Sequence, residues 1–174
     1  MSQRTSRSMA LHLGLGVVVA SLTGVAVYTS GVSTIRIEDR CDPASFNAAV
    51  APGTCVQDGG TTFDEFIAEL RATGVAEHWR FKEDEFHIRA GEAVNAFNIG
   101  GEVHSFTEVR NFGGGVVQVL NDLSGAGPTI QECTALVPVP PGTTTAAKVL
   151  TRPGVHKFQC CIHPWMRSEV TVRR

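Results

Sequence analysis

The sequence predicts a mainly β protein, an antiparallel sandwich or barrel with a short helical region before it. From residue 79 onward, several short stretches alternate apolar and polar side chains, which is the two-residue period of half-buried strands. Glycine and proline residues separate these stretches, as turns separate strands. Apolar residues make up 43% of the 174 residues and charged residues 18%, a balance that can fill a core and does not suit a disordered chain.

Charge and composition exclude several classes of protein. The formal net charge is −2, which argues against a basic nucleic-acid-binding protein. The composition also excludes a collagen, a coiled coil and a polytopic membrane protein. Two counts stand out: the chain has five cysteines, an odd number, and Met166 is its only methionine beyond the N-terminal segment.

Residues 1–30 are expected to be a signal peptide or an N-terminal membrane anchor. Arg4 and Arg7 precede an almost wholly apolar run at 9–28, which is long enough to span a bilayer. No clear cleavage site follows, so a cleaved signal, an uncleaved anchor and a buried helix all remain open. In both membrane interpretations the rest of the chain is exported. It would be periplasmic or extracellular, or held at the outer face of the cytoplasmic membrane, with membrane contact only through 9–28.

Residues 31–77 are predicted to form an extension that contains a disulfide and one helix. Cys41 and Cys55 lie among turn-forming dipeptides, and a local disulfide is the simplest interpretation. An amphipathic helix is predicted at 63–73, where apolar residues follow the spacing i, i+3, i+4, i+7. Thr61 or Thr62 can cap it and Gly74 can end it. The apolar stripe, expected to pack on the main domain, consists of Phe63, Phe66, Ile67 and Leu70.

Residues 78–174 are predicted to form the β domain. A strand is expected around Phe86 and Ile88, and the others at 93–99, 103–109, 144–150, 155–160 and 170–172. Between them, 110–142 is rich in glycine and proline and is expected to be a long ordered loop with little regular structure. A loop of this length is unusual in a compact domain and is either functional or pinned by Cys133.

The chemistry is concentrated near the C-terminus. Cys160, His163 and Met166 follow one another at three-residue intervals. A thiolate, an imidazole and a thioether suit copper in both of its oxidation states, and two histidines with a cysteine and a weak axial methionine form the blue-copper set. His104, which follows a strand and a Gly-Gly turn, is the best second histidine.

These residues resemble the cupredoxins, and the Cys-x₂-His-x₂-Met spacing is similar to that of amicyanin and plastocyanin-like proteins. The resemblance covers about 79–174 apart from the insertion at 110–142. The matching residues are Gly91, Glu92, Val94, Asn98, His104, Gly154, His156, Phe158, Cys160, His163, Pro164 and Met166.

The resemblance implies a Greek-key β-sandwich with one copper ion. His104, Cys160 and His163 would be equatorial ligands and Met166 the axial ligand. Such a protein carries electrons and is not an enzyme. Electrons would leave through His163, the ligand nearest the surface in the family. Apolar residues beside it would form a patch for transient docking of redox partner proteins: Pro164 and Trp165.

Two positions depart from the family pattern. Ser105 follows the first histidine where the family often has asparagine, so the side-chain bond that steadies the ligand loop is expected to be lost or altered. His156 stands where an aromatic residue is usual. Both departures bear on the redox potential more than on the identity of the metal.

Strand alternation separates the two adjacent cysteines. Phe158 and Cys160 point to one face and Cys161 to the other, so Cys160 would bind metal and Cys161 would pair with Cys133. A vicinal Cys160–Cys161 disulfide is the strained alternative.

Several other functions are compatible with the same residues. A copper-trafficking or copper-sequestering protein on the same scaffold is the main alternative. A structural zinc site suits methionine poorly, His104 can be an ordinary sheet histidine, and Met166 can be core filler. Enzymes with trinuclear copper clusters need His-x-His pairs, which this sequence lacks. A cysteine nucleophile and a metal-free module are the remaining interpretations. The histidines not expected to bind metal are His12, His78, His87 and His156.

Overall fold

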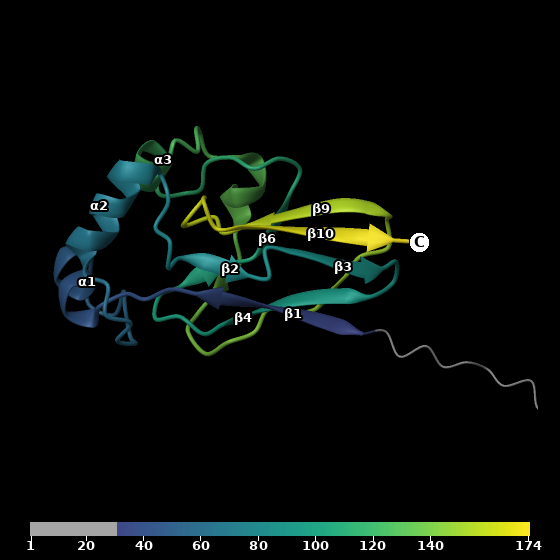
Figure 1. The fold of residues 1–174 in the computed structure, drawn as a ribbon, viewed down its shortest axis with the longest axis horizontal. Coiled ribbons are helices and arrows are strands. Elements are labelled where there is room, and N and C mark those ends of the chain that lie inside the picture. The colour runs from purple at the N-terminus through teal and green to yellow at the C-terminus, as the bar shows by residue number, and fades with distance from the viewer. Residues whose placement is uncertain (1–30) are drawn as a thin grey trace, which may run out of the picture.

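The computed structural model describes residues 31–174, which form two four-stranded β-sheets with helices at one end (Figure 1). One sheet has the strand order β2-β1-β4-β8 and the other β3-β10-β9-β6, and β5 and β7 form a separate pair. The mainly β fold class is therefore confirmed. The strands are β1 Val32–Glu38, β2 Arg80–Lys82, β3 Glu85–Arg89, β4 Ala93–Asn98, β5 His104–Ser105, β6 Thr107–Val109, β7 Pro138–Val139, β8 Lys148–Val149, β9 Gly154–Gln159 and β10 Arg167–Arg173.

The sheets are mixed, whereas a purely antiparallel arrangement was expected. β1 pairs in parallel with β4, and β10 pairs in parallel with β3. The remaining pairs of named strands are antiparallel. Parallel neighbours need a crossover, and here α1 and α2 lie in the chain between β1 and β4.

Residues 31–77 are predicted to lie outside the β domain, and for strand β1 this prediction is wrong. β1 lies inside its sheet, between β2 and β4, so a boundary at residue 77 would cut through that sheet. The segment alternates, and Ile35 and Ile37 are buried. This two-residue period is typical of a strand, although residues that favour turns follow it directly.

The helix predicted at 63–73 is confirmed as α2, Phe63–Thr73. Thr62 caps it in a capping box with Glu65, and Gly74 ends it in the left-handed conformation at φ 77°. A second helix, α1 at Pro43–Ala49, lies where the Asp42-Pro43 pair predicts a turn. The same dipeptide can also begin a helix, because aspartate is a favoured N-cap residue and proline is favoured at the first helical position.

The segment 110–142 is more regular than expected. It contains a helix, α3 Gln118–Ser124, a 3₁₀ turn, η1 Gln131–Ala135, and strand β7. The signal for α3 was present in the sequence. Val116, Leu120 and Leu123 have helical spacing, and Gly125 ends the helix with a positive φ of 66°.

Two predicted strands are shorter than expected. The strand at 103–109 is divided into β5 and β6, and the strand at 144–150 is reduced to β8. In the first case β5 pairs with β7 while β6 pairs with β9, so the chain changes partners at Phe106. The strands expected at 93–99 and 155–160 match β4 and β9 closely.

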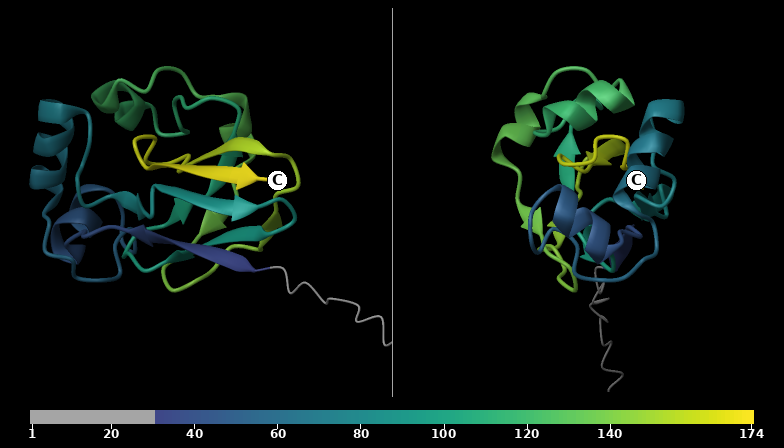
Figure 2. Two further views of the ribbon diagram at one scale, coloured as in Figure 1. Left: turned by 45° about the vertical axis from the view of Figure 1, so that its right-hand side comes forward. Right: turned by 90° about the vertical axis from the view of Figure 1, so that its left-hand side faces the viewer.

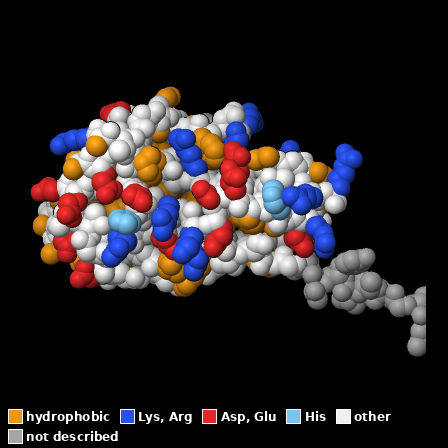
Figure 3. Space-filling view, viewed as in Figure 1, with side chains coloured by type: hydrophobic (Ala, Val, Ile, Leu, Met, Phe, Trp, Pro, Cys, Tyr) orange, Lys and Arg blue, Asp and Glu red, His pale blue; other side chains and the backbone are white. Residues whose placement is uncertain are grey.

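The core fills the space between the sheets and continues under the helices. Trp79, Phe46, Phe158 and Ile35 are among its largest fully buried side chains. α1, α2 and α3 gather at one end of the sandwich, around the loop between β9 and β10, while β1 begins at the opposite end (Figure 2). Charged side chains of both signs are interspersed on the face shown in Figure 3.

Within residues 31–174, no helix has both the length and the apolar character needed to cross a membrane. The apolar run at 9–28 lies outside the described residues.

Candidate metal centre

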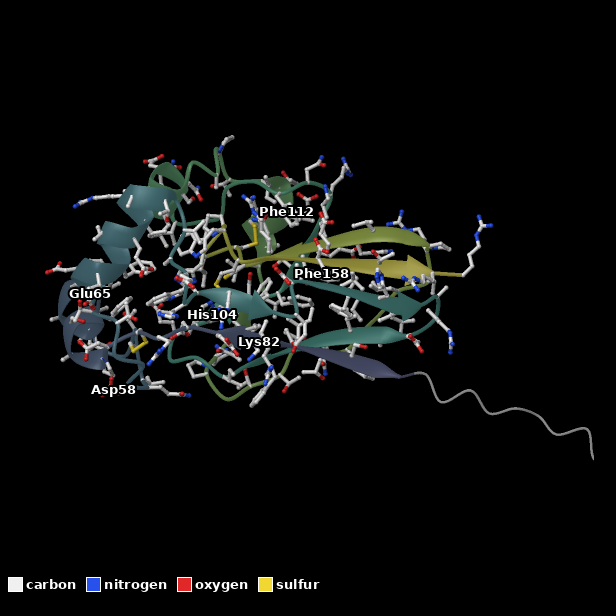
Figure 4. All side chains as sticks on the ribbon, in the orientation of Figure 1. Asp58, Glu65, Lys82, His104, Phe112 and Phe158 are labelled. Atoms are coloured by element: carbon white, nitrogen blue, oxygen red, sulfur yellow. A yellow bond between two sulfur atoms is a disulfide. The ribbon has the colours of Figure 1, made fainter. Side chains whose placement is uncertain are left out.

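His104, Cys160 and His163 come together in the interior of the molecule, at the end of the sandwich that the helices cover. Nδ1 of His104 lies 3.2 Å from Nδ1 of His163, and each of these atoms lies 3.8 Å from Sγ of Cys160. His104 and Cys160 have no exposed surface and His163 is 3% exposed. His104 is on β5 and the other two residues are in the loop after β9; His104 is labelled in Figure 4.

The two Nδ1 atoms and Sγ form a triangle with the dimensions of a site for one metal ion. A point equidistant from the two Nδ1 atoms and Sγ is about 2.1 Å from each of them, and bonds from metal to imidazole or thiolate are about 2.0–2.3 Å long. Two imidazoles and one thiolate are the equatorial set of a blue-copper site. The three residues therefore fit a single copper ion without moving apart.

Backbone amides surround the sulfur of Cys160. The N–H groups of Ser105 and His163 each point at Sγ from 3.4 Å. Burial acts to raise the pKa of the thiol, but the hydrogen bonds and charges of His104 and His163 outweigh it and hold the pKa well below its ordinary value. The thiolate form, which binds metals, is thus favoured here.

His104 is oriented by a carboxylate on its far side. Its Nε2 lies 2.8 Å from Oδ2 of Asp39, and both side chains are fully buried. Since Nε2–H donates to Asp39, Nδ1 is the ring nitrogen left for the cluster. Burial lowers the pKa of His104, but the hydrogen bonds and charges of Asp39 and Cys160 raise it to about 9.

Asp39 is in turn held by the turn that precedes His104. Its Oδ1 accepts from the N–H of Gly101 at 2.9 Å, and its Oδ2 accepts from the N–H of Glu102 at 3.0 Å. Burial would raise the pKa of Asp39, but His104 and these amides lower it to about 2. A Cβ on Gly100 would lie 1.9 Å from Oδ2, so only glycine lets the carboxylate approach.

Sequence-based reasoning missed Asp39. It follows β1 and lies 65 positions before His104 in the chain. No local spacing links the two, and the only signal was the Gly-Gly pair, which marks a close backbone approach.

His163 is enclosed by a carboxylate and two aromatic rings. Its Nε2 lies 3.7 Å from Oε2 of Glu102, and Oε2 also accepts the indole N–H of Trp79. The rings of Trp165 and Phe66 lie edge-on to the imidazole, with centroids 5.5 and 6.4 Å away. Burial raises the pKa of Glu102. His163 is the most exposed of the three residues, and it lines a cavity between the helices and the ligand loop.

Met166 belongs to the same loop. Its N–H donates to the carbonyl of His163, and its carbonyl accepts from the N–H of Cys160, both at 3.0 Å. The side chain is 1% exposed and belongs to the core cluster that also includes Cys160. These bonds close residues 160–166 into one compact turn.

Ser105 does provide a side-chain bond to the ligand loop. Its Oγ accepts from the N–H of Cys161 at 2.8 Å. Of the two expected outcomes, loss or alteration of this bond, loss is therefore excluded, because the short serine side chain reaches the backbone directly.

The structure contains both disulfides considered in the sequence, Cys41–Cys55 and Cys133–Cys161. Among residues 31–174, Cys160 is the free cysteine. The second disulfide ties η1 to the residue beside Cys160. Gly115 packs against the backbone of Cys161, since a Cβ at position 115 would lie 2.2 Å from the carbonyl oxygen of Cys161.

The two expected docking residues are only partly at the surface. Pro164 is buried and Trp165 is half-buried against Phe66 and His163. Within the described part of the chain, the buried indole Nε1 of Trp165 has no hydrogen-bond partner. α2 covers the loop, which is why these residues form no broad exposed patch.

Other histidines lie elsewhere. His156 is buried and its ring lies 2.7 Å from Glu108 and 2.8 Å from the carbonyl of Arg152. His87 is exposed on β3 and His78 is half-buried. His12 lies outside the described residues.

No protein-family model matches the chain, and no curated protein matches it. Among solved structures, it is similar to a purple cupredoxin from Nitrosopumilus maritimus, with a TM-score of 0.45, 18% identity and coverage of 81% of this chain and 99% of the other. It is also similar to a reduced amicyanin mutant, with a TM-score of 0.38, 18% identity and coverage of 54% and 73%. A further amicyanin mutant, in its Cu(I) form, has a TM-score of 0.36, 18% identity and the same coverage.

Proposed function

We propose that this chain is an exported type 1 copper protein that carries single electrons between redox partner proteins. The observation that supports it most is the triangle of His104, Cys160 and His163, whose three donor atoms suit one ion at bonding distance. Bound copper would supply the exchange of one electron between its two oxidation states. Met166 would be the axial ligand, since it lies in the same closed turn.

The protein residues would keep the site rigid. Asp39 orients His104, two amides face the thiolate, and hydrogen bonds close the ligand loop. A site whose donors are already in place reorganises little when its charge changes, which favours fast electron transfer. Nothing in this role requires a substrate bond to be made or broken, so the chain would be an electron carrier and not an enzyme.

The two disulfides support an extracytoplasmic location, since such bonds persist in oxidising compartments. With the apolar run at 9–28, they suit a periplasmic or extracellular protein, or one anchored at the outer face of the cytoplasmic membrane. Partners would dock transiently at the end of the sandwich where His163 lies nearest to the outside.

The test is an optical and EPR spectrum of the purified chain with Cu(II). An intense visible thiolate-to-copper band is expected. Cys160→Ala should abolish it, and the double change Cys133→Ala with Cys161→Ala should leave it in place. A band that survives Cys160→Ala would refute the ligand assignment.

Potentiometry separates electron transfer from copper trafficking. A carrier should be reduced and reoxidised repeatedly without loss of metal. If each cycle releases copper to a chelator, the trafficking role is the correct one.

A further inference from the structure

A cavity of about 840 Å³ lies between the helices and the ligand loop. α1, α2 and α3 line its sides, and His163 and Glu102 lie where it meets the sandwich. In Figure 2 the ligand loop lies among these three helices when the molecule is viewed from this end. Its volume is within the range of about 300–1,000 Å³ that is usual for small-molecule sites.

The walls of the cavity are apolar and firmly held. Phe46, Phe66 and Leu120 are buried in the core cluster and also line the cavity. The capping box of α2 and the N-cap of α1 hold these helices, and the Cys41–Cys55 disulfide lies beside α1. The cavity therefore exists before any ligand binds, which reduces the ordering that a ligand must bring about.

One polar group in the cavity has an unused acceptor. Oε2 of Glu102 accepts the indole N–H of Trp79 and lies beside Nε2 of His163. Within residues 31–174, no hydrogen bond is made to the other oxygen, Oε1. Glu102 is 6% exposed and lines the cavity, so Oε1 is free to accept a hydrogen bond from a donor group on a molecule that enters the cavity.

We propose that this cavity binds a small aromatic molecule that carries one O–H or N–H group. Its ring system would pack against the wall that Phe46, Phe63 and Phe66 form together, and its donor would bond to Glu102. Mostly apolar walls with few convergent polar groups are typical of such sites. The bound molecule would contact the ring of His163, which places it beside the candidate metal centre. Binding itself does not depend on the proposed function, because the cavity is formed by the protein alone.

The probe is naphthol, compared with its methyl ether, which has the same rings but no O–H. Each is titrated into the metal-free full-length chain and followed by calorimetry. Naphthol should bind saturably at one site, and the ether should bind about tenfold more weakly, the effect of one lost hydrogen bond to a buried acceptor. No saturable binding of naphthol, or equal affinity for the two compounds, would overturn the proposal.

A matched pair of variants locates the site. Val119 is 58% exposed and lines the cavity, whereas Val149 is 57% exposed on β8 and does not. Val119→Trp should weaken naphthol binding about tenfold or more by filling the mouth, and Val149→Trp should leave it unchanged. Binding that is insensitive to Val119→Trp places the ligand elsewhere and refutes the assignment.

Discussion

Oδ2 of Asp39 lies 2.8 Å from Nε2 of His104, and neither side chain has any exposed surface. The contact joins the end of β1 to β5 through the interior of the protein. Carboxylate partners of this kind fix the ring orientation and the basicity of a metal-binding histidine.

Asp39→Asn should lower copper affinity about 10–100-fold while the chain remains folded, the usual cost of losing such a partner. Asparagine keeps the shape but not the charge that favours Nε2–H on His104. Competition with a copper chelator measures the affinity. Asp58→Asn, at an exposed aspartate, is the control and should have no effect. An unchanged affinity in Asp39→Asn would mean that the carboxylate serves only the fold.

Met166→Leu should leave the visible band in place and raise the reduction potential by at least about 60 mV, a tenfold change in the preference for Cu(I). The axial donor stabilises Cu(II) and tunes the potential, and leucine has nearly the same volume, so packing changes little. Cyclic voltammetry measures the shift. Leu70→Met, an exchange of similar size in the buried face of α2, is the control. An unaltered potential would identify Met166 as core filler.

Removal of the Cys133–Cys161 disulfide should lower the free energy of unfolding by about 3–4 kcal/mol, because the bond closes a long loop in the unfolded chain. The two residues are 28 positions apart. Denaturant unfolding of the double alanine variant, compared with the unchanged chain, measures the loss. A loss near zero would show that the loop from β6 to β9 is held by its other contacts alone.

Glu108 should contribute a pH-dependent part of the stability. Burial raises its pKa, but hydrogen bonds and charges of Lys148 and His156 outweigh this and set the pKa below its ordinary value of 4.5. A lowered pKa in the folded state stabilises the fold above pH 4.5, and the contribution is lost as the pH falls through the lowered value.

Glu108→Gln should therefore be less stable than the unchanged chain at pH 7, by up to about 1 kcal/mol, and equally stable at the acid end. Denaturant midpoints of the two proteins, measured from pH 7 down to the acid end, test this expectation. Glu85→Gln, at an exposed glutamate on β3, is the control and should show no such pH dependence. A stability difference in Glu108→Gln that does not change with pH would contradict the assignment to this ion pair.

Much of the candidate site could be predicted from local spacing. Cys160, His163 and Met166 lie in one turn, and the alternation along β9 distinguishes Cys160 from Cys161. The helix α2 and strands β4 and β9 were also predictable, because periodicity and capping act within a few residues. The sequence predicts a turn at α1 and an irregular loop at α3, and both predictions are wrong. The reason is that residues typical of turns also begin and end helices.

The types of donor side chain, their spacing in the ligand loop and the mainly β character can be read from the amino-acid sequence. Three features become visible only in the folded chain: β1 lies between β2 and β4, Asp39 contacts His104 from 65 positions away, and the helices cover His163 and line a cavity. The two groups differ in how far along the chain the interactions that produce them extend. Backbone propensity and side-chain period are local properties, whereas strand order, burial and contacts across the core depend on how distant segments pack together.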